Sequence, residues 1–135
     1  MESLIILVRS LLLALACGVA GGAAAQTVFV IANSGTQVAA GEVSDVFLGE
    51  KQFAGSTKLV PVDNAPLQEA FVSKALGLDS GKYNAKWAKK SFRDGLNPPA
   101  VKSGDLEVTE FVKRTPGAIG YVGSAPTGVT VVTKY

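Results

Sequence analysis

The 135-residue chain contains no histidine and a single cysteine, Cys17. The lack of histidine excludes a histidine general base, a histidine-containing catalytic triad and a histidine-rich metal site. Because Cys17 lies in the apolar N-terminal segment, residues 26–135 hold no disulfide, no thiol nucleophile and no cysteine-ligated zinc. No HExxH motif, Walker loop or serine elbow is present, and the carboxylates are scattered along the chain. We therefore expect no catalytic residue, no metal and no cofactor, and a protein that is not an enzyme.

Charge and length limit the remaining classes. Residues 26–135 carry 12 basic and 10 acidic side chains, a balance that does not favour general nucleic-acid binding. The same 110 residues suffice for one globular domain with one hydrophobic core. The sequence therefore predicts a single domain without nucleic acid as a partner.

Residues 1–25 are typical of a secretory signal peptide. Arg9 precedes the apolar stretch 11–19, and the small residues 23–25 suit the pocket of signal peptidase. We expect cleavage after Ala25 and a periplasmic or secreted domain of residues 26–135. Because a spanning helix needs about 20 apolar residues, the leader favours cleavage over a permanent anchor. Lipid anchoring at Cys17 is the alternative, so the membrane would be reached only through an uncleaved or lipidated leader.

After the leader, apolar runs typical of strands alternate with segments of helical periodicity. The expected strands are 26–32, 58–62, 101–103, 118–122 and 129–133, and the expected helices are 41–48, 63–78, 83–93 and 105–114. Asp63 or Asn64 and Asp105 are the expected caps of two helices. The alternation predicts an α/β fold with a mostly parallel sheet covered by helices.

Four segments in one order resemble a known family. They are VFVIANSG (28–35), EVSDVFLGE (42–50), LVPVDNAPLQEAF (59–71) and W…FRDGLNPPAVKS…VTEFVKRTPGAIGYVG (87–123). The chain resembles the phosphate-binding-protein-like family, the solute receptors of phosphate ABC transporters, and especially its short envelope members. The resemblance implies a type II periplasmic-binding-protein-like fold. It implies a single lobe, because full receptors have two and these segments match the second.

One segment departs from the pattern of the family. The phosphate receptors carry an Arg and an Asp-Gly-Ser-Gly-Thr run at the start of the helix that ends here in Phe71. This chain has Val-Asp-Asn-Ala-Pro-Leu at 62–67 instead. Asp63 would repel phosphate, and Pro66 has no N–H to donate. Tight phosphate capture is therefore not expected at this position.

A candidate ligand site follows the first strand, at Ser34, Gly35 and Thr36. Hydroxyls and a glycine in such a turn can form a backbone nest for a small anion. We expect this turn at the carboxyl end of the sheet, where open α/β folds bind ligands. The alternative is an ordinary turn that uses its polar groups for local hydrogen bonds.

A second candidate site is a row of basic side chains at helical spacing, the basic stripe: Lys86, Lys89, Lys90 and Arg93, extended by Lys82. It could dock an acidic partner or an anionic lipid surface, or it could be the solvated face of an amphipathic helix. The opposite face is expected to be buried through Tyr83, Trp87, Ala88 and Phe92. For Tyr121, packing is favoured over ligand binding.

Two functions are consistent with these patterns. The first is a secreted, non-enzymatic solute-binding-like protein related to the phosphate receptors, which binds a small anion weakly near residues 34–36. The alternative is an envelope interaction module that kept the fold and lost the ligand, with an envelope protein or an ABC transporter component as its partner. A dimer could supply the second wall that a single lobe lacks.

Overall fold

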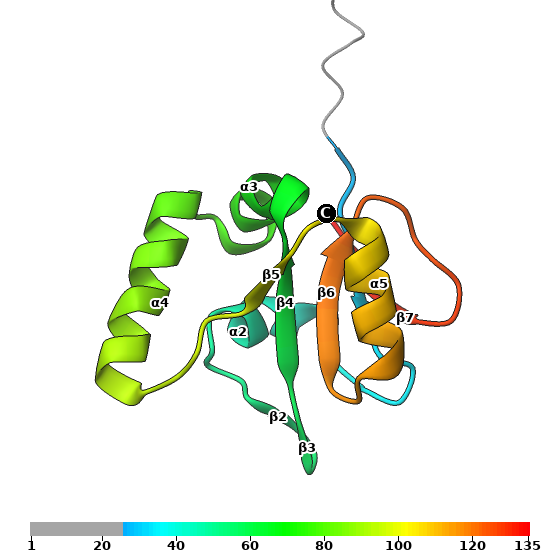
Figure 1. The fold of residues 1–135 in the computed structure, drawn as a ribbon, viewed down its shortest axis with the longest axis horizontal. Coiled ribbons are helices and arrows are strands. Elements are labelled where there is room, and N and C mark those ends of the chain that lie inside the picture. The colour runs from blue at the N-terminus through cyan, green and yellow to red at the C-terminus, as the bar shows by residue number, and fades with distance from the viewer. Residues whose placement is uncertain (1–25) are drawn as a thin grey trace, which may run out of the picture.

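The computed structural model describes residues 26–135, which form a five-stranded sheet with helices on both faces (Figure 1). The strands of this sheet are β1 (Phe29–Ala32), β4 (Val60–Asn64), β5 (Ala100–Lys102), β6 (Ala118–Val122) and β7 (Thr130–Lys134). The predicted leader, with its cleavage site and the lipidation alternative at Cys17, lies outside the described residues. Within residues 26–135, no helix is long and apolar enough to cross a membrane.

The fold belongs to the α/β class and its sheet is mostly parallel, as predicted. Its strand order is β5-β4-β6-β1-β7. Strand β4 pairs in parallel with both β5 and β6, whereas β1 pairs antiparallel with β6 and β7. Four strands therefore run in one direction and β1 alone runs in the other. In consequence, the carboxyl end of β1 lies at the edge of the sheet where β4 and β6 begin.

One face of the sheet is covered by most of the helical segments. They are η1 (Ala40–Glu42), α2 (Val43–Phe47), η2 (Ala65–Leu67), α3 (Gln68–Phe71), the π-helical turn η3 (Val72–Leu76) and α4 (Ser80–Asp94). The larger part of the core lies here. The ring of Phe71 stacks on Tyr121 with centroids 4.0 Å apart, and Phe47 meets Phe71 edge-on at 4.7 Å. These aromatic contacts fix α2 and α3 against β6.

The other face is covered by α5 (Asp105–Arg114), which is drawn beside β6 in Figure 1. Val108 and Val112 of α5 are fully buried against the sheet with Ile31, Val62 and Val122. A Cβ on Gly120 would lie only 2.7 Å from Cγ1 of Val108. Strand β6 therefore needs glycine at this point for α5 to pack closely.

The structure adds a hairpin that the sequence patterns did not predict. Strands β2 (Phe53–Ala54) and β3 (Thr57–Lys58) pair antiparallel around Gly55, whose φ is 61°. The predicted strand 58–62 is divided between β3 and β4. Two-residue strands carry too little alternation to be recognised from the sequence.

The prediction that Ala88 and Phe92 are buried is wrong. Both lie on the exposed side of α4, and the Phe92 side chain is 95% exposed. Tyr83 and Trp87 are buried as predicted. Phe92 follows Trp87 by five residues, which turns it about 140° around the helix axis at 3.6 residues per turn.

Candidate functional site

Helix α4 begins and ends at well-formed caps. The Asp79 carboxylate accepts a hydrogen bond from the Lys82 N–H at 2.7 Å, which satisfies one free donor of the first turn. Gly95 ends the helix in the left-handed region with a φ of 69°. Between these caps the helix has 15 residues, enough to present a continuous basic row.

Tyr83 and Trp87 attach α4 to the rest of the domain. The Trp87 indole N–H donates to the carbonyl of Phe47 at 3.0 Å, and only 6% of Trp87 is exposed. Trp87 thus joins α4 to the end of α2. The prediction that the single tryptophan packs in the core is confirmed.

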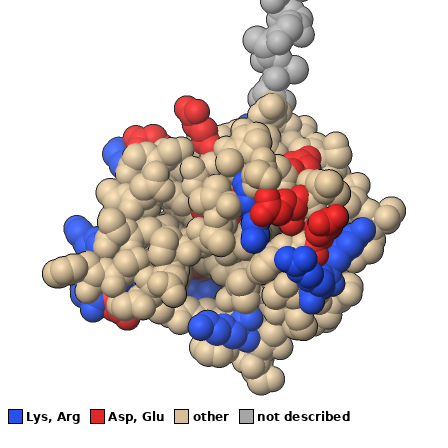
Figure 2. Space-filling model, in the orientation of Figure 1, with Lys and Arg blue, Asp and Glu red and all other residues tan. Residues whose placement is uncertain are grey.

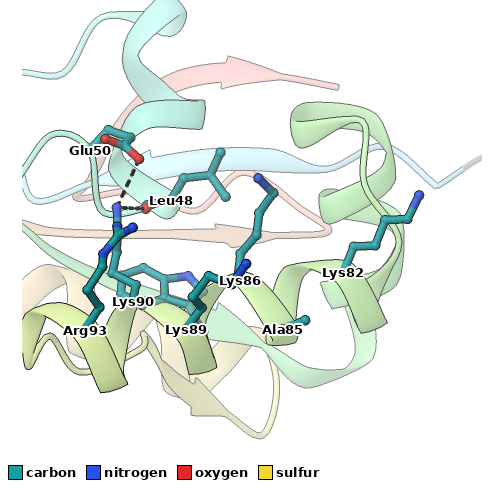
Figure 3. Close-up of a pocket in the computed structure, with 9 residues that line it drawn as sticks. Leu48, Glu50, Lys82, Ala85, Lys86, Lys89, Lys90 and Arg93 are labelled. Atoms are coloured by element: carbon teal, nitrogen blue, oxygen red, sulfur yellow. Dashed lines mark hydrogen bonds and ion pairs between the residues drawn. The ribbon is translucent and has the colours of Figure 1, made fainter.

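The basic stripe borders a hollow between α4 and the residues that follow α2 (Figure 3). We call this hollow of about 410 Å³ the α4 groove; its lining residues are Leu48, Glu50, Lys82, Ala85, Lys86, Trp87, Lys89, Lys90 and Arg93. All of the predicted stripe residues are therefore together on one surface. They line it alongside the apolar side chains of Leu48, Ala85 and Trp87.

Two cations of the groove already have partners. The Lys90 ammonium donates to the carbonyl of Leu48 at 2.9 Å and to Oε1 of Glu50 at 3.0 Å. Arg93 forms an ion pair with its neighbour Asp94 at 3.2 Å. The Lys90 bonds join α4 to the segment after α2 and hold this end of the groove in a defined shape.

The other three cations are available to a ligand. Within residues 26–135, the ammonium groups of Lys82, Lys86 and Lys89 form neither an ion pair nor a hydrogen bond with another side chain. The groove thus combines five basic side chains with one carboxylate, Glu50. In Figure 2 basic and acidic residues lie side by side along the left margin, where α4 lies, and also over α5. The excess of positive charge belongs to the lining of the groove, and it attracts anionic groups.

The turn Ser34–Thr36 uses its polar groups internally. The Gly35 N–H donates to Oδ1 of Asn33 at 3.0 Å, and the Thr36 N–H donates to the Asn33 carbonyl at 2.8 Å. The Thr36 hydroxyl accepts from the Gly117 N–H at 2.8 Å. These bonds are those of an ordinary side-chain-stabilised turn, and they occupy the two N–H groups that a bound anion would need.

The predicted position of this turn is wrong. Because β1 runs antiparallel to β6, Ser34–Thr36 lies beside the start of β6, away from the carboxyl ends of the parallel strands. Ser34 and Thr36 also border a hollow of about 520 Å³ that contains Glu42. Its bond to Lys51 holds the pKa of Glu42 below the usual value, so this carboxyl stays ionised. Lys51 neutralises this charge and itself lines a hollow beside Gly35 and Thr36, so it is the internal use of the N–H groups of the turn that disfavours an anion there.

At the opposite edge, where β4, β5 and β6 end, carboxylates of the chain occupy the donors. Oδ2 of Asp105 accepts from the Gly123 N–H at 3.0 Å, and Oδ1 accepts from the Asn64 amide at 2.8 Å. Glu107 accepts from the N–H and the hydroxyl of Ser103. A phosphate at this edge would compete with two carboxylates for the same donors.

The predicted caps at Asp63 and Asp105 are wrong. Gly104 is the residue before α5, and Asp105 bonds across to β4 and β6 instead. Asn64 precedes η2 without a side-chain cap, and its Oδ1 is buried with no hydrogen-bond partner in the described residues. Asn64 and Asp105 bond instead to residues that are distant in the sequence, and these contacts outweigh the local capping preference.

Asp63 lies inside the core, with 1% of the residue exposed. The Tyr121 hydroxyl donates to its Oδ1 at 2.8 Å, and the Tyr83 hydroxyl donates to Oδ2 at 3.1 Å. Burial raises the pKa of Asp63, against the opposing effect of these hydrogen bonds. Burial and the nearby carboxylate raise the pKa of both tyrosines. The cluster joins β4, α4 and β6, so Tyr121 has a structural role.

Two glycines of the family-like segments have a structural explanation. Gly49, in FLG, has a φ of 75°, and a Cβ there would lie 2.7 Å from the Trp87 ring. Gly117, in PGAIGYV, has a φ of 83°, and a Cβ would lie 2.1 Å from the carbonyl oxygen of Lys58. Both positions require glycine for the backbone conformation and for close packing.

Sequence reasoning missed the second wall of the groove and the buried carboxylate. Leu48 and Glu50 lie more than 30 residues before the stripe, and only the folded chain brings them to α4. Asp63 directly follows an apolar strand run, and this position was the available signal of its burial. Among residues 26–135, no group of three or more acidic, histidine or cysteine side chains is placed to hold a metal ion.

In comparisons with known proteins, no family model matches the chain and no curated protein matches it significantly.

Proposed function

We propose that residues 26–135 are a secreted, non-enzymatic binding module that has one lobe of the periplasmic-binding-protein-like fold and is related to the phosphate-receptor-like family. Its ligands are anionic, and they bind in the α4 groove. The helix-covered sheet with four parallel strands is compatible with such a lobe. The four segments that resemble the phosphate receptors, which follow one another in the same order along the chain, support the relationship.

The observation that carries this function is the charge of the α4 groove. Five basic side chains line it, and three of them have no partner of opposite charge in the described residues. An anion in the groove therefore gains Coulomb attraction without breaking an existing ion pair at Lys82, Lys86 or Lys89. At the other two sites the backbone donors are already used, because the Gly35 and Thr36 N–H groups bond to Asn33 and the Gly123 N–H bonds to Asp105.

The interaction-module alternative shares this surface and differs in the ligand. It is favoured by the carboxylates of Asp105 and Glu107, which occupy donors at the edge where open α/β sheets bind solutes. In that function the groove holds a partner protein, and no free solute binds elsewhere on the domain.

Calorimetric titration tests the proposed function. We expect citrate, a small trivalent anion, to bind the protein weakly, and phosphate and sulfate to bind more weakly still. The variant Lys82→Gln, Lys86→Gln, Lys89→Gln should lose citrate binding. A matched variant that removes three charges elsewhere, Lys58→Gln, Lys113→Gln, Lys134→Gln, should keep it. Binding of citrate that is equal in the two variants would refute the groove as the site.

A further inference from the structure

We infer that a second hollow, beside the first half of β4, binds a small aromatic molecule that carries one carboxylate. We call this hollow of about 380 Å³ the β4 cavity. Its walls come from β3, β4 and the segment 96–100, with single residues of α2, α4 and α5. Its volume lies within the usual range of small-molecule sites, about 300–1,000 Å³. The inference goes beyond the proposed function and does not depend on anion binding in the α4 groove.

Prolines on both sides of the sheet edge open this cavity. Strand β5 pairs in parallel with β4 as far as the pair Val62 and Ala100. The next pair in this register would be Pro61 and Pro99. Because neither proline has an N–H to donate, the ladder ends before them. The segment 95–99, which joins α4 to β5 in Figure 1, therefore lines the cavity opposite β4 without pairing with it.

The backbone of the cavity wall offers few hydrogen-bond donors. The N–H of Leu59 donates to the carbonyl of Gln52 at 2.8 Å, and the N–H of Val60 donates to the carbonyl of Gly117 at 2.8 Å. The three prolines of the lining have no N–H. A phosphate or sulfate ion needs several donors to replace its hydration shell. The cavity is therefore unsuited to inorganic anions.

Apolar side chains make up most of the wall. Val60, Pro61 and Leu96 are half-buried, so part of each apolar surface is open to a ligand. Phe111 is also half-buried and lines the cavity from α5. Aromatic rings pack well against the flat surfaces of the phenyl ring and the prolines. Burial of a planar apolar ligand here supplies the main favourable free energy of binding.

The charge of the lining favours one negative group on the ligand. Among the described residues that line the cavity there are two lysines and no carboxylate. Lys51 already pairs with Glu42 at 2.8 Å, whereas Lys58 is exposed and forms no ion pair within residues 26–135. Lys58 is therefore the cation that attracts a ligand carboxylate. A trivalent anion such as citrate would place its other charges against apolar walls, so the cavity and the α4 groove select different ligands.

Calorimetric titration with naphthylacetate tests this assignment, because this probe has two fused rings and one carboxylate. The neutral naphthylacetamide has the same rings without the charge. We expect the natural protein to bind the acid at least about fivefold more tightly than the amide, the effect of one partly exposed ion pair. Lys58→Gln should lower the affinity for the acid to that for the amide and leave the affinity for the amide unchanged. Lys134→Gln, on β7 at the opposite edge of the sheet, is the matched control and should bind both probes as the natural protein does.

A second pair of variants tests the apolar wall. Leu96→Ala should weaken the binding of both probes by about threefold or more, because it removes apolar surface from the cavity. Leu106→Ala, which shortens an exposed side chain of α5, should weaken neither. Urea unfolding shows whether each variant is folded.

Four results would overturn the inference. They are the absence of naphthylacetate binding at millimolar concentration, equal affinity of the natural protein for the acid and the amide, and tighter binding of decanoate, a flexible carboxylate without a ring. The fourth is loss of naphthylacetate binding in the Lys82→Gln, Lys86→Gln, Lys89→Gln variant while Lys58→Gln binds normally, which would place the probe in the α4 groove. The citrate titration of the α4 groove is independent of all four, so the inference and the proposed function fail separately.

Discussion

Replacing Asp63 with asparagine tests whether the buried carboxyl controls the pH dependence of stability. Asp63 is 1% exposed and bonds to Tyr83 and Tyr121. Burial raises its pKa above the ordinary 3.8, so the folded state holds the proton more tightly than the unfolded state does. The stability that this proton provides is complete below pH 3.8 and is lost as the pH rises through the folded-state pKa.

The expected magnitude follows from proton linkage. Between the raised folded-state pKa and 3.8, the natural protein should gain up to about 1.4 kcal/mol per pH unit of acidification relative to Asp63→Asn. Asparagine keeps an acceptor for one tyrosine hydroxyl and removes the titration. Asp63→Ala removes both acceptors and should cost about 1–3 kcal/mol for each hydroxyl left unpaired, offset at neutral pH by removal of the buried charge.

Urea unfolding followed by the emission of Trp87 measures this difference at a series of pH values from about 7 to about 4. Acidification also protonates Glu42 and Glu107. Hydrogen bonds lower the pKa of both carboxyls, so their protonation at low pH removes a stabilising interaction and destabilises the fold. The difference between the natural protein and Asp63→Asn cancels those effects. Asp45→Asn, which removes an exposed carboxylate, is the matched control. Parallel stability curves for the natural protein and Asp63→Asn would refute the reasoning.

Three further variants test the local structure, each by urea unfolding. Gly117→Ala should destabilise the domain by at least about 2 kcal/mol, because alanine at a φ of 83° is strained and its Cβ would overlap the Lys58 carbonyl; an unchanged midpoint would contradict this. Thr36→Ala should cost about 1–3 kcal/mol by leaving the Gly117 N–H unpaired, with citrate affinity unaffected; a loss of anion binding at unchanged stability would favour a ligand role for the turn. Asp79→Ala should cost about 1 kcal/mol because the Lys82 N–H loses its cap, and Asp79→Asn should restore most of it.

Local patterns predicted the elements whose signals are strong. The helix 105–114 and the strand 118–122 have the predicted bounds. Each has a clear apolar periodicity. The Thr115-Pro116-Gly117 turn marks the end of the helix and the beginning of the strand. The hairpin β2–β3 was missed because two-residue strands carry no measurable period.

Strand direction could not be predicted in the same way. β1 has the continuous apolar pattern of a buried parallel strand, yet it pairs antiparallel with β6 and β7. Direction depends on which strands become neighbours and on how the connections cross the sheet. The position of Ser34–Thr36 was wrong for this reason alone, since the turn itself forms as expected.

The candidate site was predicted in part. The helical spacing of Lys86, Lys89, Lys90 and Arg93 placed them on one row, and the structure places them along one groove. The opposite wall depends on Leu48 and Glu50, which approach α4 only through tertiary packing. The Asp63 cluster depends likewise on tyrosines 20 and 58 residues away.

The most direct test of the central claim is a nuclear magnetic resonance titration of isotope-labelled protein with citrate and with phosphate. The account predicts shift changes in the amides of Lys82–Arg93 and in the Trp87 indole N–H. It predicts none at Gly35 and Thr36, and none at Gly123. Shift changes confined to Ser34–Thr36 or to Gly123 would contradict the account, as would a spectrum that citrate leaves unchanged.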